Sequence, residues 1–330
     1  MSFPAVHIIL PTYNRSHLLP DVIASILSQE YRDFELLIVD DGSTDQTEQL
    51  IQALQEQDGR LRYCKLSKNH GIGFARQAGL ENVSGKYIAL ADSDDTWIAG
   101  KLRAQVEILE MYPEIDILFG DYININHITN REVSGFKHTA AGMLYLATRQ
   151  IKEHLFLVES GIERGITIAN FIAVPTMIIR STLFKKTGGF NVDLPAAADF
   201  EFGFRAAALG ARFAYLDYPL IYRHVYSDSR TSDVIKSVSM IIHAYTVAHD
   251  LSMSIHRGDL VAYVDRGLQR NYICLMEAHG KVGNRNQVWN SYRKVVSYGF
   301  SIRDFVYFLA FWVGPGFISF VQRFRGRKQS

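Results

Sequence analysis

The chain has 330 residues, of which 48% are hydrophobic and 21% charged, a composition typical of a globular protein and not of a disordered one. The length allows one large domain or two, and the formal net charge of +1 gives no overall attraction to nucleic acid. Cys64 lies in an apolar, strand-like stretch, which favours free thiols for it and Cys274 over a disulfide. Because no basic or long apolar leader precedes the first strand pattern, we expect no signal peptide and a cytoplasmic protein.

Short apolar runs alternate with helical patterns over the first part of the chain. The expected strands are residues 6–10, 34–39, 61–66, 86–91 and 116–122. The expected helices are residues 16–29, 44–57, 73–83 and 98–112. Alternation of helices with strands that are apolar on both faces predicts an α/β fold with a doubly wound, mainly parallel sheet flanked by helices.

The alternation weakens beyond residue 130. The expected elements there are a helix over 142–158, a strand over 173–180, a turn over 187–190 and a helix over 199–210. From about residue 233 onward the pattern is helical throughout. These changes predict a domain over residues 1–228 and a helical C-terminal region over 229–330.

The end of the chain combines an apolar segment with basic residues. Residues 305–321 carry no charge, but Gly314-Pro315-Gly316 interrupts them, and a spanning helix needs about 20 apolar residues. One interpretation is that residues 303–330 contact the anionic inner face of the plasma membrane. The other is a helix hairpin packed on the main domain, with a solvated basic tail. The sequence leaves both open, together with a lipid-linked acceptor site or a contact within a homo-oligomer.

Polar residues gather where each of the first four expected strands ends. The four segments are residues 11–15, 40–45, 69–76 and 92–95. Ligands of doubly wound sheets bind at the carboxyl ends of the strands, so the segments predict one shared binding site. Several carboxylates crowded there would repel one another unless a cation were bound.

The segment Asp92-Ser93-Asp94 supplies suitable oxygen ligands for such a cation. Two carboxylates just past a strand can hold Mg²⁺ or Mn²⁺, with the remaining ligands coming from water and phosphate oxygens. An Asp-x-Asp segment alone is common in solvated turns, but the four segments together favour a metal-bound diphosphate. NAD binding is disfavoured because Arg76 replaces the third glycine of a dinucleotide fingerprint over residues 71–76, and the chain has no ATP-binding P-loop.

In the order of these motifs, residues 1–225 resemble glycosyltransferase family 2, the inverting enzymes with a GT-A fold. The resemblance implies a hexosyltransferase that moves a sugar from a nucleotide-sugar, a UDP-sugar, to a hydroxyl of a glycan or lipid-linked acceptor. It implies Mn²⁺ or Mg²⁺ as cofactor and a place in polysaccharide, glycolipid or glycoprotein synthesis.

The resemblance also assigns the site residues. Those expected to contact the nucleotide or the donor sugar are Pro11, Thr12, Tyr13, Asp40, Arg76, Asp92, Ser93, Asp95 and Arg223. The expected metal ligands are Asp94 and His224, although a lone histidine is as often structural. An aspartate such as Asp40 can accept the imide N–H of uracil, and the planar guanidinium of Arg76 suits phosphate. Asp41 and Asp45 are expected to cap the helix that follows them.

Inverting transfer also needs a base that deprotonates the acceptor hydroxyl. The family takes it from a Glu-Asp pair that opens a helix, and here Asp199 matches the aspartate while Ala198 replaces the glutamate. The replacement leaves the positioning of the acceptor open. A match to the family at residues 188–190 favours Asp199 as base over Asp199 as a helix cap. Glu201 is a weaker candidate.

Two other functions remain as alternatives. A sugar nucleotidyltransferase would carry a glycine-rich, basic loop after the first strand, and residues 11–17 lack one. A non-catalytic module that binds nucleotide or glycan is compatible with the alanine at position 198. Slow, metal-dependent hydrolysis of a UDP-sugar would separate an enzyme from such a module.

Overall fold

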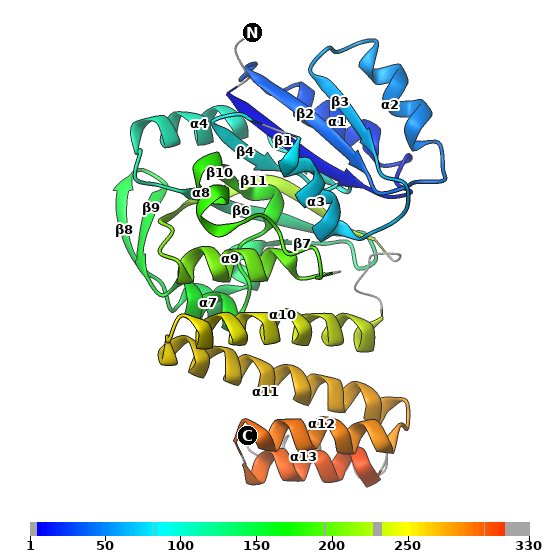
Figure 1. Ribbon diagram of the computed structural model, residues 1–330, viewed down its shortest axis with the longest axis vertical. Helices are drawn as coiled ribbons and strands as arrows, with labels where there is room; N and C mark the ends of the chain where they lie inside the picture. The colour runs from blue at the N-terminus through cyan, green and yellow to red at the C-terminus, as the bar shows by residue number, and fades with distance from the viewer. Residues whose placement is uncertain (1–4, 83, 195, 227–232, 300, 314–330) are drawn as a thin grey trace. The chain divides into compact units, whose positions relative to one another are not determined.

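The computed structural model describes residues 5–82, 84–194, 196–226, 233–299 and 301–313. The chain divides by its internal contacts into two units, Met1–Ser227 and Asp228–Ser330, each described by itself (Figure 1).

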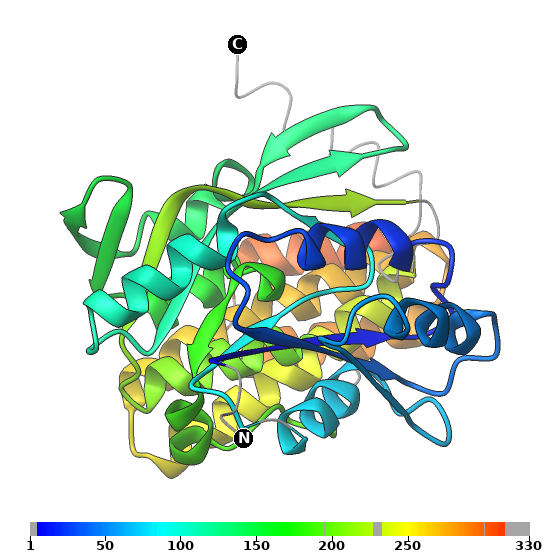
Figure 2. The same ribbon diagram turned by 90° about the horizontal axis from the view of Figure 1, so that it is seen from above.

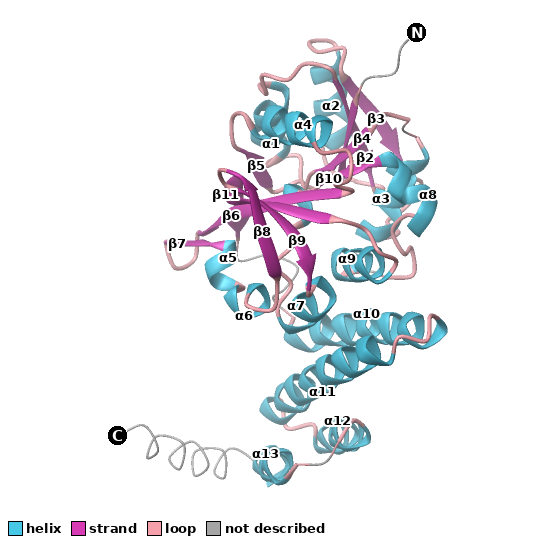
Figure 3. Cartoon of the chain, turned by 90° about the vertical axis from the view of Figure 1, so that its left-hand side faces the viewer, coloured by secondary structure: helices cyan, strands magenta, loops and turns pink. Residues whose placement is uncertain are grey.

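The first unit opens with four parallel strands and the helices that connect them. The strands are β1 (Val6–Thr12), β2 (Phe34–Asp40), β3 (Leu61–Lys65) and β4 (Tyr87–Leu90). The helices are α1 (Leu19–Leu27), α2 (Thr47–Gln55), α3 (Ile72–Glu81) and α4 (Lys101–Met111). In Figure 3, α1, α2 and α4 lie on one side of these strands and α3 lies on the other. The predicted doubly wound, mainly parallel sheet is confirmed.

The sequence explains these elements through burial. Every residue of β1 is buried, because helices cover both faces of the sheet. In α1, Leu19, Val22, Ile23 and Ile26 recur at helical spacing and form the buried face. They belong to the same core cluster as Ile8 of β1.

The second half of the first unit extends the sheet with shorter and antiparallel strands. The strands are β5 (Asp95–Trp97), β6 (Ile117–Asn126), β7 (Arg131–Ser134), β8 (Ala147–Lys152), β9 (Leu155–Ser160), β10 (Ile178–Arg180) and β11 (Phe213–Val225). The helical segments are α5 (Gly135–His138), α6 (Ala140–Met143), α7 (Ile162–Ile168), η1 (Val174–Thr176), α8 (Ser181–Thr187) and α9 (Ala198–Ala208).

The sheet order is β3-β2-β1-β4-β10-β6-β11-β9-β8, with β5 paired to β11 and β7 paired to β6. β10 is antiparallel to both of its neighbours, whereas β6 and β11 are parallel. Figure 2 shows β7 folding back along β6. The pairing of β11 with β6 shifts register twice, between Leu216 and Pro219 and between Pro219 and Tyr222.

Two predictions for this half need correction. The helix expected over 142–158 is wrong: the region holds α6 and the β8–β9 hairpin. β9 pairs with β11 and places buried Leu155 opposite Leu216, and this distant pairing outweighs the local helical pattern. The strand expected over 173–180 begins only at Ile178, because Pro175 opens the short helical turn η1 instead.

The second unit consists of four consecutive helices. They are α10 (Val234–Ser254), α11 (Gly258–Lys281), α12 (Arg285–Ser297) and α13 (Ile302–Val313). α10 packs on α11, α11 packs on α12, and α13 packs on both α11 and α12. None of the helices that the structure describes is long and apolar enough to cross a membrane. Of the apolar segment 305–321, residues 305–313 belong to α13 and the remainder lies outside the described residues.

Candidate active site

The ends of β1 and β2 form the floor of the site. Thr12 and Asp40 are the last residues of these strands and face each other in the parallel register. Asp40 is fully buried: its Oδ1 accepts the N–H of Ser43 at 2.7 Å and its Oδ2 accepts the hydroxyl of Tyr63 at 2.6 Å. Burial and the Asp40 carboxylate raise the pKa of Tyr63, so the phenol stays a donor. Thr12 is 3% exposed, and its Oγ1 has no hydrogen-bond partner among the described residues.

The residues after β2 tie the neighbouring loops together. Asp41 accepts the N–H groups of His70 at 2.8 Å and Gly71 at 2.7 Å, so the cap predicted for Asp41 is wrong. These two bonds hold the loop before α3. The next residue, Gly42, has φ of +77° and turns the chain sharply after Asp41. A Cβ on Gly42 would lie 2.7 Å from the carbonyl carbon of Lys68.

Asp45 connects the loop after β1 to the start of α2. Its Oδ1 accepts the N–H of Thr47, the first residue of α2, at 3.1 Å, but the N-cap of that helix is Gln46, so the cap predicted for Asp45 lies one residue too early. Its Oδ2 accepts the N–H of Ser16 at 3.0 Å. Of the other residues expected here, Pro11 is buried within β1 and Tyr13, just past the strand, is exposed.

The acidic residues between β4 and β5 are crowded. Asp92, Ser93 and Asp94 link the two strands, and Asp95 is the first residue of β5. Asp95 is 2% exposed, and its pKa is raised well above the usual value, first by burial and then by the charges of Asp92 and Asp94. A bound cation would relieve this repulsion, and carboxylate oxygens are suitable ligands for Mg²⁺ or Mn²⁺.

Strand β11 brings two basic residues to the acidic segment. It pairs antiparallel with β5, and Arg223 stands opposite Asp95. The backbone N–H of the next residue, His224, donates to Asp95 Oδ1 at 3.3 Å. The three residues of β5 are too short a run for sequence periodicity to reveal.

Acids from two distant parts of the chain act on the charge of Arg223. Burial alone would lower its pKa, but the negative charges around it raise the pKa above the usual value. The carboxylates that do so are those of Asp95, Asp92 and Asp199, in that order. The base predicted from the second half of the chain therefore shares an electrostatic environment with the acidic segment after β4.

His224 lies among aromatic and polar neighbours. Its Nε2 is 3.3 Å from Thr96 Oγ1, and its Nδ1 is 3.0 Å from His127 Nε2. The ring of His127 stacks on both His224 and Tyr226. Burial, followed by the charge of His127, lowers the pKa of His224, which favours the neutral imidazole that metals bind.

The oxygen and nitrogen atoms near the acidic segment are of the types that bind divalent cations. Asp94 offers carboxylate oxygens and His224 an imidazole, although Nε2 of His224 would have to leave Thr96 to reach a metal. Within the residues that the structure describes, no group of three His, Cys, Asp or Glu gathers as a metal site.

Arg76 joins α3 to the acidic segment. The side chain is buried, and its Nη2 donates to Asp92 Oδ1 at 2.6 Å. The guanidinium carbon lies 5.6 Å from the centre of the Phe190 ring, close enough for a cation–π contact. Its Nε is buried without a partner among the described residues. The Nε–H of this arginine is thus a donor that a ligand could satisfy.

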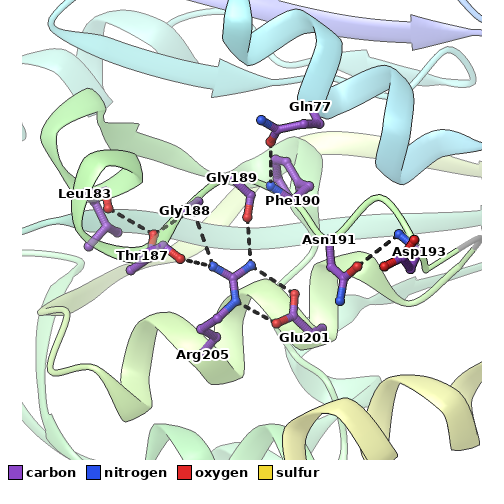
Figure 4. Close-up of polar contacts among 10 residues, drawn as sticks. All are labelled: Gln77, Leu183, Thr187, Gly188, Gly189, Phe190, Asn191, Asp193, Glu201 and Arg205. Carbon is purple, nitrogen blue, oxygen red and sulfur yellow. Dashed lines mark hydrogen bonds and ion pairs between the residues drawn. The ribbon is translucent and has the colours of Figure 1, made fainter. Parts of the chain in front are cut away.

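The loop before α9 packs closely on the start of α3. The side-chain oxygen of Gln77 accepts the N–H of Phe190 at 3.0 Å, as Figure 4 shows. A Cβ on Gly73 would lie 2.8 Å from the carbonyl oxygens of both Asn191 and Leu194, so only glycine permits this approach.

Arg205 fixes the same loop from the other side (Figure 4). It donates to the carbonyl oxygens of Thr187 and, at 2.7 Å, Gly189. It also forms two bonds with Glu201, at 2.6 and 3.0 Å, and the two side chains are 14% and 3% exposed. Glu201, the weaker candidate for the base, is thus engaged in a buried ion pair.

Asp199 is the second residue of α9. The N-cap is Ala197, which adopts a left-handed conformation with φ of +58°, so Asp199 does not cap the helix. Asp199 Oδ2 accepts a bond from Asn170 Nδ2 at 3.3 Å. Ala198, at the position of the family's glutamate, is buried. Sequence reasoning missed Asn170, although an asparagine within an apolar run was a usable signal.

Known proteins resemble this chain in sequence and in fold. The model of glycosyl transferase family 2 matches residues 7–180. A glucosyltransferase of Escherichia coli, WfgD, named for transfer from UDP-Glc to α-D-GlcNAc-diphosphoundecaprenol, is 38% identical over 136 residues, which are 41% of this chain and 53% of that protein. The Bacillus subtilis protein TuaG, named a putative teichuronic acid biosynthesis glycosyltransferase, is 39% identical over 106 residues, 32% of this chain and 42% of that protein. The matches thus span about half the length of these relatives.

Two solved structures share the fold. TarS 1–349 of S. aureus, in complex with UDP-GlcNAc, has a TM-score of 0.62 at 21% identity and covers 88% of this chain and 81% of its own. The mannosyltransferase PcManGT of Pyrobaculum calidifontis, in complex with GDP-Man and Mn²⁺, has a TM-score of 0.58 at 18% identity, with 91% and 77% covered. The family match spans more than half of the chain and the fold is GT-A, so the chain belongs to glycosyl transferase family 2.

Proposed function

We propose that the chain is an inverting glycosyltransferase that moves a sugar from a UDP-sugar to an acceptor hydroxyl in a single displacement. The observation that carries the proposal is the pairing of β11 with β5, which sets Arg223 opposite Asp95 at the acidic segment, where the charge of Asp199 also acts on the Arg223 guanidinium. The name of the E. coli relative and the UDP-GlcNAc bound to TarS support a UDP-sugar donor. In this proposal the first unit is the nucleotide-sugar-binding and catalytic domain.

The nucleotide lies over the ends of β1 and β2. Thr12 Oγ1 is buried without a partner among the described residues, and such a group costs about 1–3 kcal/mol unless a ligand satisfies it. Asp40 accepts the imide N–H of uracil through a lone pair that Ser43 and Tyr63 leave open. Arg76 donates its Nε–H to the ribose or phosphate, next to Asp92.

Asp94 and His224 would hold Mn²⁺ or Mg²⁺ beside the donor diphosphate. The Mn²⁺ in the complex of PcManGT supports a divalent metal. When bound, the cation stabilises the negative charge that develops on the leaving diphosphate. Arg223 adds a positive charge beside the acidic segment, and the charge of Asp95, its partner in the β5–β11 pairing, stabilises that guanidinium.

Asp199 is the general base of the reaction. As the acceptor oxygen attacks the anomeric carbon from the face opposite the nucleotide, Asp199 takes the hydroxyl proton, and the bond to the diphosphate oxygen breaks. Asn170 orients the carboxylate through its bond to Oδ2. Base assistance of this kind contributes about 10²–10⁴-fold.

The test is Asp199→Asn, with Asp193→Asn as the matched control on the exposed loop before α9. We expect Asp199→Asn to abolish transfer while binding UDP as the wild type does by calorimetry, and the control to keep both properties. Loss of UDP binding together with transfer would contradict the base assignment. Excess EDTA should remove the activity, and full activity in EDTA would refute the metal.

A donor screen separates the proposal from its alternatives. Mass spectrometry with UDP-, GDP- and dTDP-sugars, with and without Mn²⁺, should show slow release of UDP from one UDP-sugar. Release of pyrophosphate from a nucleoside triphosphate and a sugar phosphate would instead indicate a nucleotidyltransferase. Tight binding of a UDP-sugar without turnover would indicate a binding module. For the acceptor, the name of the E. coli relative favours a diphosphate-linked polyprenyl glycan as the first compound to test.

A further inference from the structure

The last fifty residues differ in charge from the rest of the chain. Residues 281–330 carry nine Lys and Arg against one Asp or Glu, a net charge of +8, whereas the whole chain has +1. Four of the nine basic residues lie on α12 and α13, Lys281 is the last residue of α11, and four follow in residues 314–330. Such a concentration of positive charge favours an anionic partner.

One face of α12 presents this charge next to an aromatic ring. Arg285, Trp289, Arg293 and Val296 follow one another at intervals of four, four and three residues, which places them along one side of the helix, and all four are exposed. Trp289 is 44% exposed, a large apolar area for a soluble surface. The ion pairs among the described residues include neither arginine.

The adjoining face of α13 is apolar and exposed. Ile302 is 76% exposed, and Phe305 and Val306 are exposed as well. The two helices are joined by contacts between aromatic rings. The centre of the Trp289 ring lies 6.1 Å from the centre of the Trp312 ring and 5.5 Å from that of Phe308. The exposed rings of α12 and α13 therefore border a single aromatic cluster, and α12 and α13 lie side by side in Figure 1.

We propose that this basic aromatic face, formed by Arg285, Trp289, Arg293, Ile302, Phe305 and Val306, binds the surface of an anionic lipid membrane. Tryptophan favours the membrane–water interface, arginine is attracted to anionic headgroups, and aliphatic side chains insert among the acyl chains. A second copy of the chain is a poorer partner, because two faces of like charge repel each other. Nucleic acid would leave Ile302 and Val306 without an apolar environment.

This surface belongs to the second unit and does not depend on the proposed transfer reaction. Membrane binding and sugar transfer are separate measurements, so either proposal can fail while the other stands. If both hold, the face would bring the enzyme to the bilayer that contains a polyprenyl-linked acceptor.

The test is flotation of the full chain with vesicles of POPC and POPG at 3:1, compared with vesicles of POPC alone. We expect binding to the anionic vesicles that weakens as NaCl rises. Each basic residue near such a surface changes partitioning about fivefold, so Arg285→Glu with Arg293→Glu should lower it by about 30-fold or more. Trp289→Ser should weaken binding without removing its salt dependence.

The matched control is Arg131→Glu with Lys152→Glu, which makes the same change of charge at exposed positions of β7 and β8 in the first unit. It should bind as the wild type does, and circular dichroism should show equal helix content in all variants. Equal binding of wild type and Arg285→Glu/Arg293→Glu, or equal binding to both kinds of vesicle, would overturn the proposal. The proposal would also be overturned if no variant bound vesicles and the chain instead formed a dimer in solution that Trp289→Ser abolished.

Discussion

The ion pair between Arg205 and Glu201 allows a sharp test of how the loop before α9 is held. Arg205→Met would leave the Glu201 carboxylate buried without its partner and remove the donors to Thr187 and Gly189. Breaking a buried pair by removing one member costs about 3–5 kcal/mol. For a unit of this size, we expect the melting temperature to fall by about 10 °C.

The measurement should report on the first unit alone. Trp97 is buried in that unit, whereas Trp289 and Trp312 belong to the second, so Trp289→Phe and Trp312→Phe leave Trp97 as the single fluorescent reporter. Urea unfolding followed by Trp97 emission then gives the change in the free energy of unfolding. The double variant Arg205→Met/Glu201→Met should be less destabilised than Arg205→Met, because no charge remains buried.

The control is an exposed ion pair of the same type. Arg103 lies 2.8 Å from Glu30, and the two side chains are 54% and 57% exposed. Arg103→Met should therefore cost less than about 1 kcal/mol. If Arg205→Met were equally mild, Arg205 would not hold the loop, and the placement of Asp199 would need another explanation.

Three further predictions address single side chains. Thr12→Val should raise the free energy of unfolding by about 1 kcal/mol, because it removes a buried hydroxyl that has no partner among the described residues. The same variant should bind UDP more weakly by calorimetry, and unchanged binding would place the nucleotide elsewhere. Asn170→Ala should lower kcat about tenfold and leave UDP binding intact, since it frees the carboxylate of Asp199; an effect on KM alone would contradict an orienting role. Burial lowers the pKa of Lys101 from 10.5 in the unfolded chain to about 7 in the folded chain. Between these two pH values the unfolded chain binds a proton that the folded chain lacks, so the free energy of unfolding rises with pH. Lys101→Met should remove up to about 3 kcal/mol of that rise between pH 7 and 9.5, measured as urea midpoints, and an unchanged rise would show that Lys101 is not the source.

The parallel half of the fold was readable from the sequence because its signals are local. β1 to β4 are continuous apolar runs, and the helices between them repeat their apolar residues at helical spacing. The β8–β9 hairpin was missed because its pairing partner β11 lies about sixty residues further along the chain. Asp41 was misread for a similar reason, since its acceptor role depends on His70 and Gly71, 29 and 30 residues away.

The same distinction applies to the candidate site. The four polar segments at the strand ends could be predicted to meet, because the topology of a doubly wound sheet requires it. The residues that support them could not: Tyr63 contacts Asp40 across 23 residues and His127 contacts His224 across 97. Nothing in the local sequence around His127 distinguishes it from a histidine in a solvated hairpin.

The two register shifts in β11 have an evolutionary consequence. The strand before Leu216 pairs with β9 within the core of the sheet, and the strand after Tyr222 carries the residues that face the acidic segment. A bulge absorbs an added or deleted residue without turning the following side chains to the wrong face. Descendants of this chain can therefore change length near positions 217 and 218 while both flanking halves keep their alignment. An insertion at 223 or 224 would instead exchange the arginine and the histidine between opposite sides of the sheet.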